Sequence, residues 1–430
     1  YISSDSDWID FETTISTAPE QIAIAPGYLQ REWEENGRKY YHYKMDAKML
    51  NFYNFVSGAY AVKKDKWQDV NIEIYYHPDH TYNLDRFVRG LKGGFDYYTK
   101  NYSPYQHRQV RIIEFPRYMG TFAQSFANTI PFSEGAGFIA SVDDAEEGGV
   151  DYPFSITAHE LAHQWWAHQV IGAGVQGATL MSESLSEYSA LKVLEKEYGA
   201  TKMRVFLKDA LDKYLLGRTM EQKKEKPLMY NENQQYIHYQ KGSLVLYAMS
   251  DYLGETNFNQ ILSNYIDSVA FQEPPYTTSL EFVGMIEQAT PDSLQYLIKD
   301  MFKTITLYNN KIEKAESEEI DDGDYKITID YQARKYRTNE KGKRIYADDD
   351  SKGYFELNTK QDTIRSLPLA DYIEIGVFGE DDEELYLQKH KIENIFGTLE
   401  ITVPQEPKEV GIDPYNKLID TQSDDNRRKL

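Results

Sequence analysis

The sequence predicts an α+β protein in which a mostly helical region lies between two β-rich regions. Three observations support this fold class. Residues 1–75 contain short runs in which apolar and polar residues alternate, which is the two-residue period of half-buried strands. Over residues 152–305, apolar residues recur at intervals of three and four, as in helices with one buried face. From about residue 311 the alternation returns, which indicates a second β-rich region.

The overall composition excludes several classes of function. The chain has 430 residues, enough for two or three domains of roughly 100–200 residues each. Its formal net charge of −22 would repel a phosphate backbone, so we expect no nucleic-acid partner. It contains no cysteine, which excludes disulfides, thiolate ligands and cysteine nucleophiles. No run approaches the ~18 consecutive apolar residues of a membrane-spanning helix.

Turn signals divide the amino-terminal β-rich region into short strands. Runs such as FETTIST, QIAIA and KYYHYKM are separated by Pro-Gly and Asn-Gly pairs, which favour turns. A helix is expected around residues 82–100, then a strand in RQVRIIEF and a loop-rich stretch over residues 116–137. We expect residues 1–68 to form a separate β-rich segment.

The rest of the chain divides into a helical and a β-rich part. Helix-period runs include SLSEYSALKVLEKEYG, MRVFLKDALDKYLL and YQKGSLVLYAMSDYLG, and two of the helical runs stop at glycine, a common helix terminator. Farther on, YKITIDYQARKY, YIEIGVFG and GTLEITVP alternate as the strands of a β-sandwich do. We therefore expect a central domain at residues 69–308, a carboxy-terminal β-sandwich at 309–422 and a frayed polar tail at 423–430.

The stretch TAHELAHQWWAHQV, residues 157–170, carries a metal-binding pattern. His159 and His163 are four residues apart, so on a helix they project from one face. Both imidazoles can then reach one cation at the zinc–nitrogen distance of about 2.0–2.1 Å. Glu160 follows the first histidine and is placed to act as a general base toward water at the metal. His168 lies about 140° farther around the helix, so we expect it to be a surface or packing residue.

Glu160 also has a structural alternative. Thr157 and Glu160 have the spacing of a capping box, in which the glutamate would return to cap the start of its own helix. However, Asp151 followed by Pro153 offers an earlier start, because proline is favoured in the first helical turn. A helix that begins there would hold Glu160 in its interior and leave it free for catalysis.

A hydrolytic zinc site requires a third protein ligand and one open position. Glu183 is a candidate, because it follows His163 after nineteen intervening residues, near the start of a run with helical period. Glu187 lies one turn further along the same face, so the spacing does not choose between the two glutamates. Glu187 would suit the role of a carboxylate that is hydrogen-bonded to a ligand histidine. Alternatively, it is simply a residue on a solvent-exposed face of the helix.

HELAHQWW followed by SESLSEY resembles the gluzincin metallopeptidases, and specifically the M1 aminopeptidases. In that family His-Glu-x-x-His is followed, after eighteen residues, by the glutamate of an Asn-Glu-Gly sequence. Here Ser182-Glu183-Ser184 occupies that place with a spacer one residue longer, as in thermolysin-like relatives. The resemblance implies a thermolysin-like zinc peptidase domain, with a mixed sheet and a helical lobe, that binds one Zn²⁺ ion through His159, His163 and Glu183.

The stretch NTIPFSEGAGFIA resembles a degenerate form of the M1 exopeptidase motif Gly-x-Met-Glu-Asn, which lies upstream of the zinc helix. Glu134 takes the place of the motif's glutamate, which binds the protonated α-amine of the substrate and makes the enzyme an exopeptidase. Phe132-Ser133 replace the usual small residue and methionine, and Gly135 replaces asparagine. The resemblance implies substrate binding by Glu134, Gly135 and Gly137.

YIHYQKGSLVLYAM resembles the family's Tyr-x-Lys-Gly segment and places Tyr239 on the catalytic tyrosine. A phenol in that role donates a hydrogen bond to the oxyanion as the carbonyl carbon becomes tetrahedral. Tyr236 is the near alternative, but it lacks the x-Lys-Gly sequence after it.

Together these matches imply a zinc-dependent aminopeptidase that releases amino-terminal residues from peptides. The degenerate exopeptidase motif also resembles M1-like extracytoplasmic domains joined to bacterial ABC-type transport permeases. The alternative is therefore a catalytically weak or inactive peptide-binding module of a membrane transport complex. By this resemblance we expect an extracytoplasmic chain tethered to membrane-spanning segments outside the sequence, which opens at Tyr1 without a leader. The oligomeric state is left open.

Overall fold

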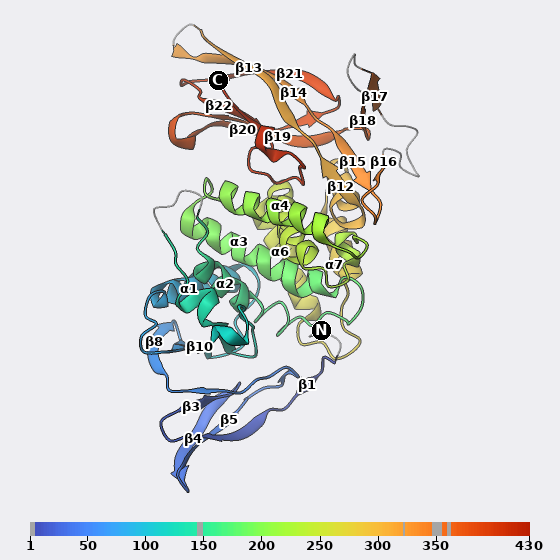
Figure 1. Cartoon of the computed structure of the whole chain (residues 1–430). Helices are drawn as coiled ribbons and strands as arrows, with labels where there is room; N and C mark the ends of the chain where they lie inside the picture. Colours follow the sequence, from blue (N-terminus) through green and yellow to red (C-terminus); the bar gives the residue numbers. More distant parts are fainter. Residues whose placement is uncertain (1–4, 144–148, 321–322, 346–354, 359–362) are drawn as a thin grey trace. The chain divides into compact units, whose positions relative to one another are not determined.

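The structure is a computed structural model that describes residues 5–143, 149–320, 323–345, 355–358 and 363–430 (Figure 1). By internal packing the chain divides into two compact units, the first of residues 1–199 with 250–290 and the second of residues 200–249 with 291–430. The α+β class is confirmed, with β-rich regions before and after a helical region along the chain. The domain boundaries expected from the sequence remain predictions.

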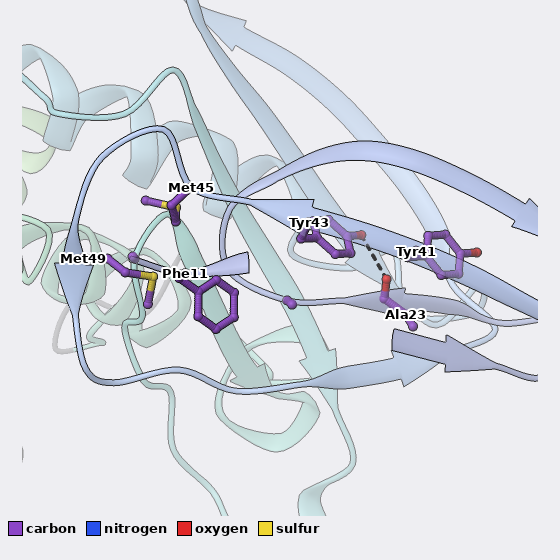
Figure 2. Close-up of a cluster of buried hydrophobic side chains, with 8 residues drawn as sticks. Phe11, Ala23, Tyr41, Tyr43, Met45 and Met49 are labelled. Carbon is purple, nitrogen blue, oxygen red and sulfur yellow. Dashed lines mark hydrogen bonds between the residues drawn. The ribbon is translucent and has the colours of Figure 1, made fainter. Parts of the chain in front are cut away.

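The amino-terminal segment of the first unit consists of short antiparallel strands. Its pairings are β1 (Trp8–Ile9) with β6 (Met49–Leu50), β3 (Ile22–Ile24) with β7 (Val56–Gly58), and a sheet of order β2 (Glu12–Thr17), β5 (Arg38–Lys44) and β4 (Tyr28–Glu35). The buried cluster drawn in Figure 2 consists of Phe11, Ala23, Ala25, Tyr41, Tyr43, Met45, Met49 and Ala127. Inside it the Tyr43 hydroxyl donates to the Ala23 carbonyl at 2.9 Å, which satisfies the polar end of a buried ring. Because Ala127 comes from the segment before β11, the cluster joins these strands to the rest of the unit.

A four-stranded mixed sheet positions part of the candidate site. Its order is β11 (Thr129–Ser133), β10 (Gln109–Phe115), β9 (Val70–Tyr76) and β8 (Ala61–Trp67). β9, β10 and β11 are parallel, whereas β8 pairs with β9 in antiparallel fashion. The carboxyl ends of three strands therefore meet at one edge of the sheet. β11 lies within the stretch predicted to be loop-rich; all its residues are buried, so it lacks the alternation that marks a half-buried strand.

Helices complete the first unit. They are α1 (Leu84–Asn101), α2 (Tyr152–Ala162), α3 (Leu185–Tyr198), α6 (Glu255–Val269) and α7 (Ser279–Ala289), with the shorter turns η1 (Arg117–Met119), η2 (Glu134–Phe138) and η3 (Leu180–Ser184). Glycines let α1 approach α2 closely. A Cβ on Gly90 would lie 3.0 Å from Thr157 Cβ, and one on Gly94 would lie 2.7 Å from Leu161 Cδ2. Larger residues at these positions would push the two helices apart.

The second unit combines helices with the carboxy-terminal β-rich region. Its helical elements are α4 (Met203–Met220), η4 (Leu228–Tyr230), η5 (Tyr236–Lys241), α5 (Gly242–Leu253), which begins in this unit, η6 (Asp292–Leu294), α8 (Gln295–Leu297), η7 (Ile298–Lys303), η9 (Glu380–Asp382) and η10 (Ser423–Asp425). One sheet has the order β13 (Lys311–Glu319), β14 (Tyr325–Gln332), β21 (Phe396–Val403), and a second has the order β20 (Glu384–Ile392), β19 (Asp371–Phe378), β22 (Glu409–Ile412), β23 (Arg427–Lys429). Two smaller sheets have the orders β12 (Ile305–Tyr308), β15 (Lys335–Thr338), β16 (Arg344–Ile345) and β17 (Phe355–Asn358), β18 (Thr363–Ser366). β13 contacts both β22 and β23, so the first two of these sheets pack together.

The polar tail forms a strand, so the expectation that it frays is wrong. β23 pairs with β22 at the edge of its sheet. Arg427 Nη2 lies 2.6 Å from Glu409 Oε2, and the guanidinium carbon lies 4.0 Å from the centroid of the Phe378 ring. These contacts hold a segment whose composition alone indicates fraying.

Candidate metal centre

Helix α2 carries His159, is capped at its carboxyl end by His163, and begins at the earlier of the two starts that the sequence allows. Asp151 caps its amino terminus, since the carboxylate accepts a hydrogen bond from the Phe154 backbone N–H at 3.0 Å. Thr157 instead donates its hydroxyl hydrogen to the Pro153 carbonyl at 2.6 Å. Glu160 is therefore an interior residue of α2, and the capping-box alternative is wrong.

Three side chains bring potential ligand atoms close together. His159 Nε2 and His163 Nε2 are 3.0 Å apart. Glu183 Oε2, from the turn η3, lies 3.4 Å from the first of these nitrogens and 3.3 Å from the second. Ligands arranged tetrahedrally about a zinc ion at about 2.0–2.2 Å are separated by about 3.3 Å. The three atoms thus fit one zinc ion with little movement.

Polar contacts of the outer ring nitrogens orient both histidines. His163 Nδ1 is 3.0 Å from the Trp166 carbonyl oxygen, which can only accept, so Nδ1 carries the hydrogen and Nε2 presents its lone pair. His159 Nδ1 is 2.6 Å from Glu187 Oε2, and this contact likewise keeps the hydrogen on Nδ1 and the lone pair on Nε2. The sequence spacing leaves Glu183 and Glu187 as alternative third ligands. The geometry brings Glu183 to both Nε2 atoms and Glu187 to the outer side of His159.

The buried charges of this group favour a bound cation. Burial by itself lowers the pKa of His159, but the carboxylates of Glu183 and Glu187 outweigh burial and hold that pKa well above its usual value. Burial would likewise raise the pKa of Glu183, yet His163 and His159 hold it well below the usual range. The carboxylates thus create a negative environment around two imidazoles, where a divalent cation can take the place of protons.

Glu160 lies in the same buried region with an incomplete set of hydrogen bonds. The residue is 6% exposed, and its Oε2 atom has no hydrogen-bond partner within the described part of the chain. Leaving a buried polar atom unpaired costs about 1–3 kcal/mol, and more for a charged group. Burial also raises the pKa of Glu160 above its usual value, which makes the carboxylate a better proton acceptor. These properties suit a base that acts on water or substrate.

The remaining aromatic and histidine residues of the stretch pack the unit. Trp165 and Trp166 are fully buried, and Trp166 Nε1 donates to Ser189 Oγ at 3.0 Å. His168 is buried, and its Nε2–H donates to the Ser125 carbonyl at 3.1 Å. The prediction of a surface or packing role for His168 is confirmed as packing.

Glu134 begins the turn η2, directly after β11. Its Oε1 atom accepts a hydrogen bond from the Arg117 backbone N–H at 3.1 Å, and its side chain is 20% exposed. A Cβ on Gly137 would lie 2.5 Å from Phe132 Cε1, so packing alone explains why this position is a glycine. A Cβ on Gly135 would meet Arg117 Cβ at 3.3 Å. The substrate-binding roles of these three residues remain predictions.

Two residues that the sequence analysis did not single out lie beside Glu134. His80 Nδ1 contacts Glu114 Oε1 and is 4.0 Å from Glu134 Oε2. Glu114 is 4% exposed, and its Oε2 accepts a hydrogen bond from the His77 backbone N–H at 2.5 Å. A signal exists in the sequence, because Glu114 lies near the end of the predicted strand RQVRIIEF and His80 follows NIEIYYH, a run in which apolar and polar residues also alternate. The parallel pairing that brings them together is not visible in the sequence.

Tyr239 belongs to the second unit and lies in the turn η5. Its half-buried ring packs edge-on against the His238 ring, with the centroids 4.5 Å apart. Tyr236, the alternative, is buried and stacks on Tyr214 with the centroids 5.8 Å apart. Packing therefore accounts for Tyr236, whereas the catalytic role of Tyr239 remains a prediction that rests on its sequence motif.

The fold and the metal centre define the class of protein. Two histidines one turn apart on a helix, a glutamate at the start of the next helix and a mixed sheet are the features of a gluzincin metallopeptidase fold. Residues 92–304 match the Peptidase family M1 domain. This match covers just under half of the chain and shows that the chain is similar to the family M1 peptidases over those residues.

Among curated proteins, the chain is similar to "Leucyl aminopeptidase" of Saccharolobus solfataricus, with 23% identity over 271 residues that cover 61% of this chain and 34% of that protein. It is also similar to "Probable aminopeptidase 1" of Sulfurisphaera tokodaii, with 28% identity over 187 residues that cover 41% of this chain and 23% of that protein. The chain therefore spans about a third or less of these relatives.

Solved structures show the same fold. Legionella pneumophila aminopeptidase A, in complex with aspartic acid, matches 96% of this chain and 45% of its own length, with a TM-score of 0.60 and 14% identity. The M1 zinc metallopeptidase of Deinococcus radiodurans matches 69% of this chain and 64% of its own length, with a TM-score of 0.52 and 16% identity. Among the described residues, no helix combines the length and apolar character needed to cross a membrane.

Proposed function

We propose that this chain is a zinc-dependent aminopeptidase that hydrolyses the first peptide bond of peptides with a free amino terminus. The observation that carries the proposal is the set of three potential zinc-ligand atoms, 3.0–3.4 Å apart, two of them from histidines at the end of the helix that also holds the buried Glu160 and one from Glu183 in η3. Similarity to curated proteins named as aminopeptidases supports it.

The residues of the metal centre divide the chemistry between them. A zinc ion held by His159, His163 and Glu183 would polarise the scissile carbonyl and lower the pKa of water toward about 7. Glu160 accepts a proton from the attacking water on its unpaired Oε2 and passes it to the leaving amine. The raised pKa of Glu160 suits both steps, the uptake of a proton from water and its release to the amine. Glu187 holds His159 in the tautomer that keeps Nε2 available as a ligand.

In this proposal Glu134 binds the protonated amino terminus of the substrate. The Arg117 N–H fixes one side of its carboxylate, and the side chain is partly exposed, so a ligand can approach it. A carboxylate forms a hydrogen-bonded ion pair with an ammonium group, whereas a blocked amine carries no charge and can offer only a neutral N–H. This difference favours free amino termini, which is what an exopeptidase requires. On its sequence motif alone, we propose that Tyr239 donates a hydrogen bond to the oxyanion.

Glu160→Gln tests the mechanism directly. The variant should retain zinc, because residue 160 is not a ligand, but lose nearly all hydrolysis of aminoacyl anilides. Glu273→Gln is a matched control in an exposed glutamate, with 66% of its side chain accessible, and should change neither property. Tyr239→Phe, measured in parallel, should lower kcat while retaining zinc. A Glu160→Gln variant as fast as the parent would show that the assigned base is wrong.

A second candidate function is favoured by the replacements around Glu134, where Phe132-Ser133 and Gly135 depart from the exopeptidase motif. In that case the chain is a peptide-binding, extracytoplasmic module tethered to the membrane-spanning segments of a transport complex. Free and amino-blocked peptides separate the possibilities. Zinc binding without cleavage of either peptide would favour the module, whereas cleavage of blocked peptides would contradict the role of Glu134.

A further inference from the structure

A second group of potential metal ligands lies at the carboxyl ends of the three parallel strands. Glu114 is the penultimate residue of β10, Glu134 directly follows β11, and the loop after β9 carries His80. In the β10–β11 register, Phe115 pairs with Ser133, so the two strands end at the same level. Parallel topology thus collects chemical groups from three separate segments at one edge of the sheet.

The donor atoms of this group have a spacing that a metal ion can bridge. One atom from each residue lies within 4.8 Å of the others. His80 Nδ1 contacts Glu114 Oε1 and is 4.0 Å from Glu134 Oε2. Bonds of about 2.0–2.2 Å hold two ligand atoms no more than about 4.4 Å apart. A small rotation of the partly exposed Glu134 side chain would therefore complete the set.

The chemistry of the donors selects the kind of ion. One imidazole nitrogen and two carboxylate oxygens are ligands that zinc accepts, whereas calcium takes oxygen ligands. Glu114 is 4% exposed, and the His77 N–H holds its Oε2 atom, which leaves Oε1 toward His80. Arg117 Nε lies 3.8 Å from Glu134 Oε1 and offsets one of the two carboxylate charges. The position of the buried carboxylate is thus set before an ion arrives.

We propose that His80, Glu114 and Glu134 form a second zinc site, weaker than the site on α2. In the occupied state the ion takes the place of the hydrogen shared between His80 Nδ1 and Glu114 Oε1, and that hydrogen leaves as a proton. The site is weaker because Glu134 must rotate, and because Arg117 offsets part of the Glu134 charge.

Zinc at this second site excludes the substrate's amino terminus, because one carboxylate of Glu134 cannot hold both an ion and an ammonium group. Added zinc therefore acts as an inhibitor that competes with free-amine substrates. This consequence rests on the proposed function, whereas the existence of the site does not.

Zinc stoichiometry tests the site without an enzyme assay. Equilibrium dialysis of the full chain against rising zinc, read by atomic absorption, should show about two ions per chain, the second bound only at higher concentration. His80→Ala should lose the second ion and keep the first. His77→Ala is the matched control, because it removes a neighbouring imidazole but keeps the backbone N–H that binds Glu114, so both ions should remain.

The outcomes separate the site from its proposed effect. Binding of only one ion by the parent chain, or a second ion that persists in His80→Ala, would overturn the site. Glu134→Gln, a change in a partly exposed side chain, should also lose the second ion, and retention of that ion would overturn the site as well. In kinetics, added zinc should raise KM and leave kcat unchanged in the parent, but not affect KM in His80→Ala. Two bound ions without this competition would leave the site in place and contradict amine binding by Glu134.

Discussion

We expect Glu187 to orient the proposed zinc ligand His159 without binding the metal itself, so its removal should weaken zinc binding and leave all three proposed ligands in place. Its Oε2 atom lies 2.6 Å from His159 Nδ1. Carboxylates in this position contribute about 10–100-fold to metal affinity. Because the Glu187 side chain is 32% exposed, water screens the interaction, and we expect Glu187→Ala to lose about tenfold in zinc affinity, or about 1.4 kcal/mol.

Competition with a chromophoric zinc chelator measures this loss. Glu187→Gln keeps an oxygen that can accept from His159 Nδ1, so it should recover part of the affinity. Glu197→Ala removes a glutamate from the same helix that pairs instead with Arg89, and should bind zinc as the parent does. Unchanged affinity in Glu187→Ala, or an equal loss in Glu197→Ala, would refute the orienting role.

Two further predictions concern stability. Gly94→Ala should lower the free energy of unfolding by about 1–3 kcal/mol, since its Cβ would lie 2.7 Å from Leu161 Cδ2, whereas Gly284→Ala in α7 meets nothing within 4 Å and should raise it by about 0.5–1 kcal/mol. Denaturant titration measures both, and equal signs would contradict the packing argument. Burial raises the pKa of Asp420 from 3.8 to about 6, so between these values the folded chain keeps a proton that the unfolded chain loses. The stability of the parent relative to Asp420→Asn should therefore fall as pH rises from about 4 to 7, by at most about 3 kcal/mol; a constant difference across this range would contradict the shift.

Local spacing predicts much of the metal centre. His159 lies in α2 and His163 caps its carboxyl end with helical backbone angles, so the helical period alone places them on one face, and Asp151 and Pro153 mark where that helix begins. The third ligand is harder, because Glu183 and Glu187 also lie one turn apart. The choice between them depends on how α3 packs against α2, which is tertiary information.

The features that the sequence did not reveal depend on contacts between distant segments. His80 and Glu114 come together through the pairing of β9 with β10, and neither residue lies in a recognisable motif. Strand β11 was not predicted because it is buried on both faces and therefore lacks the alternation of apolar and polar residues. The tail strand β23 was not predicted because it has no alternating apolar pattern. Contacts of Arg427 with Glu409 and the ring of Phe378 hold it in place instead.

We propose that hydrolysis depends on zinc held by His159, His163 and Glu183. The most direct test is the rate at which the full chain hydrolyses a free-amine aminoacyl anilide, measured after removal of metal with a chelator and again after restoration of one equivalent of zinc. We predict that the rate falls to background on chelation and returns with zinc. If the metal-free chain continues to hydrolyse the substrate at the untreated rate, hydrolysis does not depend on zinc.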